Sequence, residues 1–284
     1  MKVKIIAMHK NEVLLLKTWA IYHSNEFGVE NIYIIDNGST KEDVLTTLKE
    51  LEKLGINVIY DYPDREHFVR KGEVVKEVIE KIDSEDPGDF YIPLDCDEFL
   101  CIYDKSKKDF LFGFDNISHY LRKFIGSDET LMIGFGADNC PWDQQSFIVK
   151  GRRKCFFTRD NCLELDVGFH KGRSKRSPFN VTTPLCYLHM HNKPIKKLVE
   201  DAKQKMIGRV DSFEKGDLLK YKEEKRTGWH LVEELLIETE ADYRSFIQQK
   251  YRSVNLIEII GFIDSLHING LEYPYPNFID SFKY

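Results

Sequence analysis

The first hundred residues alternate between short apolar runs and longer amphipathic runs. In the longer runs the hydrophobic residues recur every three or four positions, as they do in a helix that covers one side of a sheet. Strands separated by helices of this length predict βαβ units and a parallel sheet. The predicted strands are 3–8, 31–36, 56–62 and 90–95, and the predicted helices are 13–28, 41–55 and 68–82.

Beyond residue 100 the periodicity weakens, although several elements can still be predicted. Residues 117–125 have a helical pattern, and 131–136, 146–151 and 184–191 have the pattern of strands. From Pro194 onward the pattern is mostly helical, with a solvated helical face over 233–252. The aromatic end after Gly270 predicts an irregular tail.

Composition limits the classes of function. The chain has 284 residues of which 42% are hydrophobic, enough for one large domain or a domain with an appendage. A net charge of -6 argues against general nucleic-acid binding. No apolar run is long enough to span a membrane, and the start, MKVKIIAMHKNE, predicts a first strand rather than a signal peptide. Six cysteines without a CxxC pair predict free thiols, so we expect a cytoplasmic protein.

Polar residues follow each predicted strand of the first half. They are His9–Glu12, Asp36–Ser39, Asp61 and Asp95–Glu98. Right-handed crossovers bring such strand ends to one edge of the sheet. In open α/β sheets ligands bind at that edge, so we expect the site there.

The segment YIPLDCDEFL carries the most specific of these polar groups. Asp95 and Asp97 are two positions apart, and in a continuing strand they point to the same side. Two converging carboxylates suit Mg²⁺ or Mn²⁺. The alternative is a polar turn after a buried strand, because D-x-D alone is common.

Several segments, taken in order, resemble the nucleotide-sugar glycosyltransferases of the GT-A fold, in the branch like families 2 and 92. They are Lys10-Asn11-Glu12, Trp19, His23 and Gly28, IYIIDNGST (32–40), IPLDCDEFL (92–100), and more loosely RRKCFF (152–157), His170 and LHMHNKP (188–194). The resemblance covers about residues 3–200. The family's usual His-Tyr is His189-Met190 here, and its usual Trp before the acceptor loop is Ile133 or absent.

This resemblance implies an α/β, Rossmann-like fold with a mostly parallel sheet flanked by helices. We expect a GT-A-like domain over residues 1–195 and a mainly helical C-terminal extension over 196–284. Asp97 would bind the divalent ion that holds the nucleotide diphosphate and acts as a Lewis acid. Asp95 would contact the ribose or the metal, and Glu98 would orient the acceptor or brace the loop.

Nucleotide contacts are expected from the strand ends and from the start of the third helix. Asp36 would accept hydrogen bonds from the base or ribose, or only cap a turn. Asn11 and Glu12 would do the same, or cap the first helix. Arg70 with Lys71 is a candidate for phosphate contact. The expected nucleotide-binding residues are Lys10, Asn11, Glu12, Asp36, Asn37, Arg70, Asp95 and Lys193.

Histidines are candidates for a third metal ligand, because neutral imidazole binds Mn²⁺ well. His189 and His191 end a predicted strand and point the same way, with His189 the stronger candidate. A polar strand end is the alternative. His170 is a rival ligand or an acceptor-loop residue, whereas His23 lies on an apolar stripe and is expected in the core.

An inverting transfer needs a general base for the acceptor hydroxyl. We predict Asp138, in GFGADN after a predicted strand, with Asp143, Glu164 and Asp166 as rivals and an ordinary loop residue as the alternative.

The basic run 150–176 has two readings, which do not exclude each other. One is a flexible loop that closes on the diphosphate. The other is a solvated or membrane-facing patch, which would place the protein at the periphery of a membrane.

The leading hypothesis is an inverting, metal-dependent glycosyltransferase of the hexosyltransferase type, active in polysaccharide biosynthesis. Its donor would be a nucleotide-activated sugar, a UDP-sugar, and its acceptor a hydroxyl of a glycan or glycolipid. A nucleotidyltransferase is the second hypothesis, although HKNEVLLL lacks the Gly-rich basic loop of that class. A non-catalytic module that binds nucleotide or glycan is the third.

Overall fold

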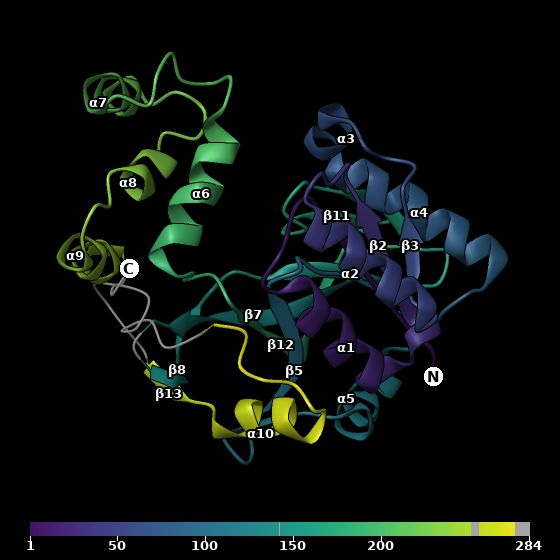
Figure 1. Ribbon diagram of the computed structural model, residues 1–284. Helices are drawn as coiled ribbons and strands as arrows, with labels where there is room; N and C mark the ends of the chain where they lie inside the picture. The colour runs from purple at the N-terminus through teal and green to yellow at the C-terminus, as the bar shows by residue number, and fades with distance from the viewer. Residues whose placement is uncertain (142, 251–255, 276–284) are drawn as a thin grey trace.

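One large mixed sheet forms the centre of the molecule in the computed structural model (Figure 1). The structure describes residues 1–141, 143–250 and 256–275. The strand order is β3-β2-β1-β4-β9-β7-β12-β5-β6, with β8 on β7 and β13 on β8. The strands of this sheet are β1 Val3–His9, β2 Ile32–Asp36, β3 Asn57–Ile59, β4 Phe90–Pro93, β5 Glu98–Asp104, β6 Asp109–Leu111, β7 Thr130–Cys140, β8 Asp143–Lys150, β9 Lys154–Thr158, β12 Asn180–His189 and β13 Leu256–Glu258.

Helices lie on both faces of the first half of this sheet. Four helices, α1 Leu16–Phe27, α2 Glu42–Lys53, α3 Arg65–Val69 and α4 Lys71–Glu85, connect β1, β2, β3 and β4, which all run parallel. The later helices are α5 Phe114–Leu121, α6 Ile195–Met206, α7 Lys215–Glu223, α8 Leu231–Leu235, α9 Glu240–Lys250 and α10 Ile260–Ile268. The α/β class predicted from the alternation is therefore confirmed.

The side chains of β1 show why its run is apolar throughout. All of its residues are buried, because successive side chains face opposite layers. Ile5 and Ala7 belong to the core that includes α1 and α2, whereas Ile6 and Met8 pack in the core that includes α4. The strand thereby delivers His9 to the edge of the sheet with helices on either side.

The second half of the sheet is mixed in direction. β9 runs antiparallel to both β4 and β7, β12 runs parallel to β7, and β5 runs antiparallel to β12. The basic run 150–176 is therefore not the loop that one reading predicted. It contains the buried strand β9 and the hairpin of β10 (Cys162–Leu165) and β11 (Gly172–Ser174). Alternation inside β9 carries Lys154 into the interior, where composition alone suggested a surface.

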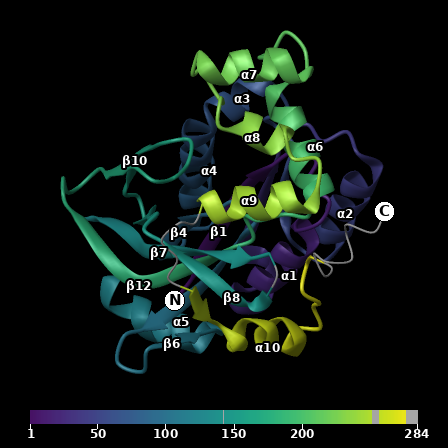
Figure 2. The same ribbon diagram turned by 90° about the vertical axis from the view of Figure 1, so that its left-hand side faces the viewer.

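The segment after Pro194 separates into two parts. Helices α6 to α9, called the helical arm here (195–250), project beside the α/β part, and α6, α7 and α8 share a small core of their own (Figures 1 and 2). β13 pairs with β8, and Phe262 of α10 joins the main core. A domain boundary near residue 195 therefore stays a prediction.

The described part of the predicted tail packs against the molecule. Tyr275 is 1% exposed, and its hydroxyl donates to the carbonyl oxygen of Met190 over 2.7 Å. Residues 276–284 of that tail lie outside the described residues.

All six cysteines are free, as predicted, and all six are buried. Among the described helices, none has both the length and the apolar character needed to cross a bilayer.

Candidate active site

His9 and Asp36 end neighbouring parallel strands and face each other at the sheet edge. They are in register, with 3.6 Å between Nε2 of His9 and Oδ1 of Asp36. Both residues are buried, and neither ring nitrogen of His9 has a hydrogen-bond partner among the described residues. Burial lowers the pKa of His9 to about 4, so the ring is neutral at pH 7. A neutral ring with open nitrogens beside a carboxylate suits the polar edge of a base or ribose. His9 was not among the residues predicted to contact the nucleotide, although it begins the polar run His9–Glu12.

Three of the predicted nucleotide contacts are engaged in holding this edge together. Asp36 accepts the backbone N–H of Ser39 at 3.0 Å, which forms a turn. The amide nitrogen of Asn37 donates to the carbonyl oxygens of Tyr62 and Asp64 at 2.6 and 2.8 Å. Asn11 accepts the backbone N–H groups of Thr40 and Lys41 at 2.8 and 3.1 Å, and so fixes the turn before α2 rather than the first helix. Lys10 is exposed beside them.

Glu12 and Lys193 connect the first strand end to the helical arm. Glu12 accepts the backbone N–H groups of Leu14 and Leu15, at 3.1 and 3.3 Å, and so holds the turn that leads into α1. Its other oxygen is 3.5 Å from Nζ of Lys193, which also pairs with Asp201 of α6 at 2.8 Å. Lys193 therefore stands where the arm meets the nucleotide half of the site.

Two lysines hold the turn that carries Asp95. Lys71 at the start of α4 pairs with one oxygen of Asp95, and Lys154 of β9 pairs with the other at 2.7 Å. Lys154 also pairs with Glu98 at 2.7 Å, and Glu98 accepts the backbone N–H of Asp95 at 2.9 Å. The side chains of Lys154 and Glu98 are 1% and 2% exposed. Glu98 therefore braces the turn, which was one of its two predicted roles.

Charge keeps Asp95 and Lys154 ionised against burial. Burial alone would raise the pKa of Asp95, but the ammonium groups of Lys154 and Lys71 hold that pKa well below its ordinary range. Burial alone would lower the pKa of Lys154, but the charges of Asp95 and Glu98 outweigh it and raise that pKa. Burial raises the pKa of Glu98 to about 7. Lys154 is thus the buried cation around which the acidic turn is built.

Asp97, His189 and Asp138 form a line across the site. Asp138 of β7 and His189 of β12 are in register, and Asp138 Oδ1 lies 3.1 Å from Nδ1 of His189. On the other side of the ring, Nε2 lies 3.4 Å from Oδ1 of Asp97. Burial would lower the pKa of His189, but Asp97 and Asp138 outweigh it and raise that pKa to about 10. Without a metal the ring is therefore protonated between the two carboxylates, and a divalent ion at Nε2 would take the place of that proton.

This line fits a divalent ion better than the Asp95–Asp97 pair does. Within the described ranges, no group of three or more His, Cys, Asp or Glu side chains converges as a metal cage. Asp97 and Nε2 of His189 nevertheless face each other, and a carboxylate holds the other nitrogen, as in many metal-binding histidines. Mg²⁺ and Mn²⁺ at nucleotide sites often take one or two protein ligands and fill the rest with phosphate and water. Both oxygens of Asp95 are already paired with lysines.

The other candidate ligands and bases lie to the side of this line. The ring of His191 packs 4.8 Å from that of His189, and burial holds its pKa well below the ordinary value. Nδ1 of His170 lies 2.7 Å from the carbonyl oxygen of Arg153. His23 is buried in the core, as expected. Of the rival bases, Asp143 accepts the N–H of Gln145, Glu164 pairs with Arg173, and Asp166 accepts the N–H of Lys171. Arg70 pairs with Glu73 at 2.6 Å on the exposed side of α4.

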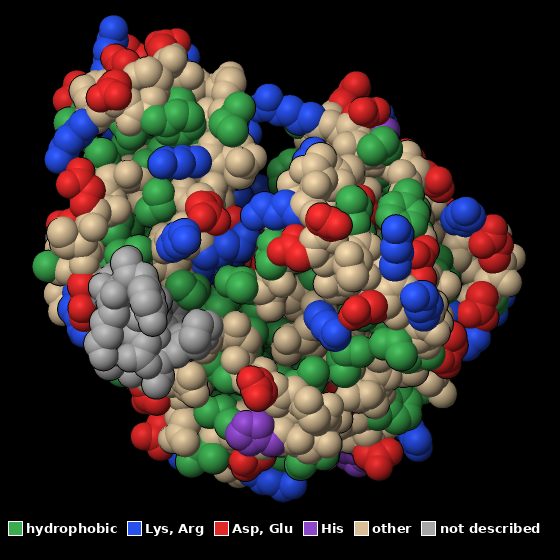
Figure 3. Space-filling model, viewed as in Figure 1, with side chains coloured by type: hydrophobic (Ala, Val, Ile, Leu, Met, Phe, Trp, Pro, Cys, Tyr) green, Lys and Arg blue, Asp and Glu red, His purple; other side chains and the backbone are tan. Residues whose placement is uncertain are grey.

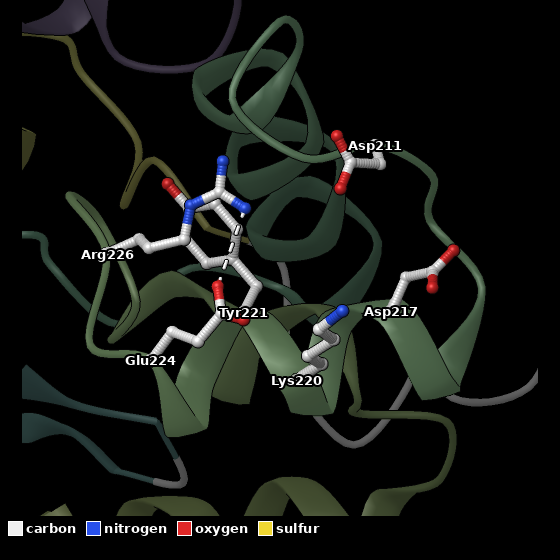
Figure 4. Close-up of a pocket in the computed structure, with 6 residues that line it drawn as sticks. All are labelled: Asp211, Asp217, Lys220, Tyr221, Glu224 and Arg226. Atoms are coloured by element: carbon white, nitrogen blue, oxygen red, sulfur yellow. Dashed lines mark ion pairs between the residues drawn. The ribbon is translucent and has the colours of Figure 1, made fainter.

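A pocket on the helical arm is separate from these strand ends (Figure 4). It is lined by Asp211, Asp217, Lys220, Tyr221, Glu224 and Arg226. Arg226 lies over the ring of Tyr221, 4.5 Å from its centre, and pairs with Glu224 at 3.7 Å. Its lining includes none of the residues at the sheet edge, so the pocket adds nothing to the chemistry there.

Comparison with known proteins gives only distant similarity. No family model and no curated protein matches the chain. Among solved structures it is similar to a cytidylyltransferase from Leptospira borgpetersenii serovar Hardjo-bovis, at 15% identity and a TM-score of 0.31 over 56% of this chain and 60% of that one. It is similar to S. aureus TarS, at 11% identity and a TM-score of 0.39 over 72% of this chain and 40% of that one.

A third similar structure is glucosyl-3-phosphoglycerate synthase from Mycobacterium tuberculosis with Mg²⁺ and UDP, at 12% identity and a TM-score of 0.27 over 46% of this chain and 42% of that one. The chain thus spans between 40% and 60% of the length of these three proteins. At such TM-scores, function has to be argued from the site itself.

Proposed function

We propose that the chain is a glycosyltransferase that moves a sugar from a nucleotide-diphosphate donor, a UDP-sugar, to a hydroxyl acceptor with inversion. The observation that carries this proposal is the line of Asp97, His189 and Asp138, beside the edge where His9 and Asp36 end their strands. The edge expected to bind the nucleotide, the side chains proposed to hold a divalent ion and the second half of the sheet meet there. Nucleotide-sugar transfer needs these three parts in this order.

Each part of the site has a task in the transfer. His9 and Asp36 would bind the base and ribose. Asp97 and Nε2 of His189 would hold a Mn²⁺ or Mg²⁺ ion, which neutralises charge on the departing diphosphate. The acceptor oxygen bonds to the anomeric carbon while the bond from that carbon to the diphosphate oxygen breaks, and the hydroxyl proton passes to a base. Asp138 contacts Nδ1 of His189, which supports a role in positioning that ring. Its role as the general base for the acceptor hydroxyl stays a prediction.

The test is release of nucleoside diphosphate from a panel of UDP- and GDP-sugars with Mn²⁺. A true donor should also raise the melting temperature, because it binds only the folded state. Asp97→Asn should abolish both the Mn²⁺-dependent release of nucleoside diphosphate and the rise in melting temperature. His189→Ala should raise the Mn²⁺ concentration that release requires. The same samples, given nucleoside triphosphate and sugar phosphate, should release no pyrophosphate. Pyrophosphate release without sugar transfer would identify a nucleotidyltransferase and overturn the proposal.

A further inference from the structure

β5 follows the acidic turn directly, and its first residues lack a neighbouring strand on one side. On the other side β12 pairs with the strand from Glu98 to Ile102, whereas β6 begins to pair only at Ile102. Backbone groups of successive residues in a strand point to alternate sides. The carbonyl oxygen of Asp97 faces β12, because it accepts the N–H of Met190 at 2.7 Å. Glu98 and Leu100 therefore direct their carbonyl groups to the side without a strand.

α1 lies beside β5 (Figure 1), and three of its side chains take the place of the missing strand. The indole N–H of Trp19 donates to the carbonyl oxygen of Glu98 at 2.9 Å. The hydroxyl of Tyr22 donates to the carbonyl oxygen of Leu100 at 2.8 Å, and Nε2 of His23 accepts the N–H of Leu100 at 3.3 Å. Residues three and four apart share one face of a helix, so all three side chains reach the same strand. We call these three side chains the α1 clamp.

The hydrogen bonds of the α1 clamp need these particular side chains. A carbonyl oxygen can only accept, so the contact of 2.9 Å between Nδ1 of His23 and the carbonyl oxygen of Trp19 places the ring proton on Nδ1. Nε2 is then free to accept the N–H of Leu100. Burial lowers the pKa of His23 to about 3, so the ring keeps this neutral form at pH 7. An apolar side chain in its place would leave a buried backbone group without a partner.

The α1 clamp lies too deep to touch a substrate. Trp19, Tyr22 and His23 are all 0% exposed. The hollow on the face drawn in Figure 3 lies between the helical arm and the α/β part rather than over α1. Any influence of these side chains on the reaction therefore passes through the backbone that they hold.

That backbone adjoins the side chains proposed to hold a divalent ion. The carbonyl oxygen of Asp95 accepts the N–H of Glu98 at 3.0 Å, which closes the turn around Asp97. On the β12 side, the carbonyl oxygen of Asp97 binds Met190, the residue after His189. The start of β5 is thus held between α1 and the strand of His189. A shift of β5 would change the distance of 3.4 Å between Oδ1 of Asp97 and Nε2 of His189.

We propose that Trp19, Tyr22 and His23 are positioning residues, which hold Asp97 opposite His189 where the two would bind a divalent ion. This inference rests on the proposed function for the role of the ion, but the hold of the α1 clamp on β5 does not. It deepens that function by connecting two parts of the site. α1 follows the polar run after β1, so one helix joins the edge expected to bind the nucleotide to the acidic turn.

Mn²⁺ binding to the full chain, followed by electron paramagnetic resonance with and without UDP, is the first test. Tyr22→Phe removes only a hydroxyl, and His23→Leu leaves the N–H of Leu100 without an acceptor. The double variant should bind Mn²⁺ roughly tenfold more weakly, as when other groups that orient a metal ligand are lost. His23→Gln, whose amide oxygen can accept the N–H of Leu100, should bind Mn²⁺ more tightly than His23→Leu.

Leu48→Ala is the control for a general loss of stability. Leu48 of α2 is buried in the same core as the α1 clamp, and a leucine side chain forms no hydrogen bond with β5. The variant should have a lower melting temperature, yet bind Mn²⁺ within about twofold of the parent at a temperature where both are folded. Unchanged Mn²⁺ affinity in the double variant would overturn the inference, and so would an equal loss in Leu48→Ala. If the double variant does not fold, Tyr22→Phe, which keeps its ring, is compared with Leu48→Ala in the same way.

Hydrogen exchange followed by mass spectrometry tests the α1 clamp without metal or nucleotide. The peptide that covers residues 94–101 should exchange faster in His23→Leu than in the parent or in Leu48→Ala. If the parent binds neither Mn²⁺ nor a UDP-sugar and this exchange still depends on His23, the proposed function fails while the hold of the α1 clamp on β5 stands. If Mn²⁺ binds but neither its affinity nor this exchange changes in the variants, the inference fails while the proposed function stands.

Discussion

Asp138 and His189 lie opposite each other on the neighbouring strands β7 and β12, and Oδ1 of Asp138 is 3.1 Å from Nδ1 of His189. This contact fixes the ring so that Nε2 points toward Asp97, 3.4 Å away. A histidine held in this way keeps one orientation. A strand from the second half of the sheet thereby orients a side chain toward the acidic turn that follows β4.

Asp138→Asn tests that relationship. The amide keeps the shape of the side chain but removes its charge, so the ring of His189 loses its electrostatic partner. We expect Mn²⁺ affinity to fall about 10- to 100-fold, the usual cost of losing such a support. Mn²⁺ binding is followed by electron paramagnetic resonance, with and without UDP. Asp143→Asn, on the neighbouring strand β8, is the control and should not change it.

A different result would give Asp138 the other predicted role. If Asp138→Asn left Mn²⁺ affinity unchanged and abolished transfer, with the loss of one limb of the pH–rate profile, Asp138 would be the general base.

Lys154→Met tests the buried cation beneath the acidic turn. The substitution keeps the length of the side chain but leaves Asp95 and Glu98 without the ammonium that both contact at 2.7 Å. Breaking a buried pair from one side costs about 3 to 5 kcal/mol of the free energy of unfolding. Urea unfolding measures it. Lys175→Met, which removes an outer pair with Asp160, should cost about 1 kcal/mol or less.

The buried cluster also offers an internal check. Adding Glu98→Gln to Lys154→Met removes one unpaired buried charge, so the double variant should recover part of the lost stability. If Lys154→Met alone were as stable as the parent, the ion pairs of Lys154 with Asp95 and Glu98 would not be what stabilises the turn after β4.

The polar strand ends in the first half of the sheet could be predicted from sequence, but most of their partners from the second half could not. Alternation in the first hundred residues locates β1, α1, β2 and α2 to within a few residues, since each element has one clear period. The alternation of strands and helices does not show which side chains pair with Asp95, because Lys154 lies 59 positions later, on β9. The contact of Asp138 with His189 likewise depends on the register of β7 and β12.

Some misreadings have a local physical cause. The third helix was predicted over 68–82 but is two helices, Arg65–Val69 and Lys71–Glu85, and Arg70 lies between them. The break places Lys71 at the first position of α4, from which it reaches Asp95. In the basic run, the many charged residues concealed the short buried strand β9, in which Lys154 has two carboxylate partners.

Gly72→Ala tests how closely α4 approaches the β10 segment. A Cβ at Gly72 would come within 2.0 Å of the backbone oxygen of Leu165, so the helix and the strand would have to separate. Alanine favours a helix over glycine by about 1 kcal/mol, but overpacking against backbone commonly costs more, about 1 to 3 kcal/mol. We therefore expect net destabilisation on thermal unfolding. Gly216→Ala, in α7 with open space around it, is the matched control and should be neutral or stabilising.

The last prediction concerns a carboxyl outside the site. Glu26 of α1 is 6% exposed, and its Oε2 has no hydrogen-bond partner among the described residues. Burial raises its pKa from 4.5 to about 7, opposed by a hydrogen bond from the backbone of Gly113. The folded state therefore holds a proton that the unfolded chain releases, so this contribution to stability is full below pH 4.5 and is lost as the pH rises through 7. From pH 4.5 to 7.5 the free energy of unfolding should fall by roughly 3 kcal/mol from this group. Glu26→Gln should remove that slope in urea unfolding curves, whereas Glu52→Gln, on the exposed side of α2, should keep it. An unchanged slope in Glu26→Gln would show that the carboxyl is ionised in the folded protein.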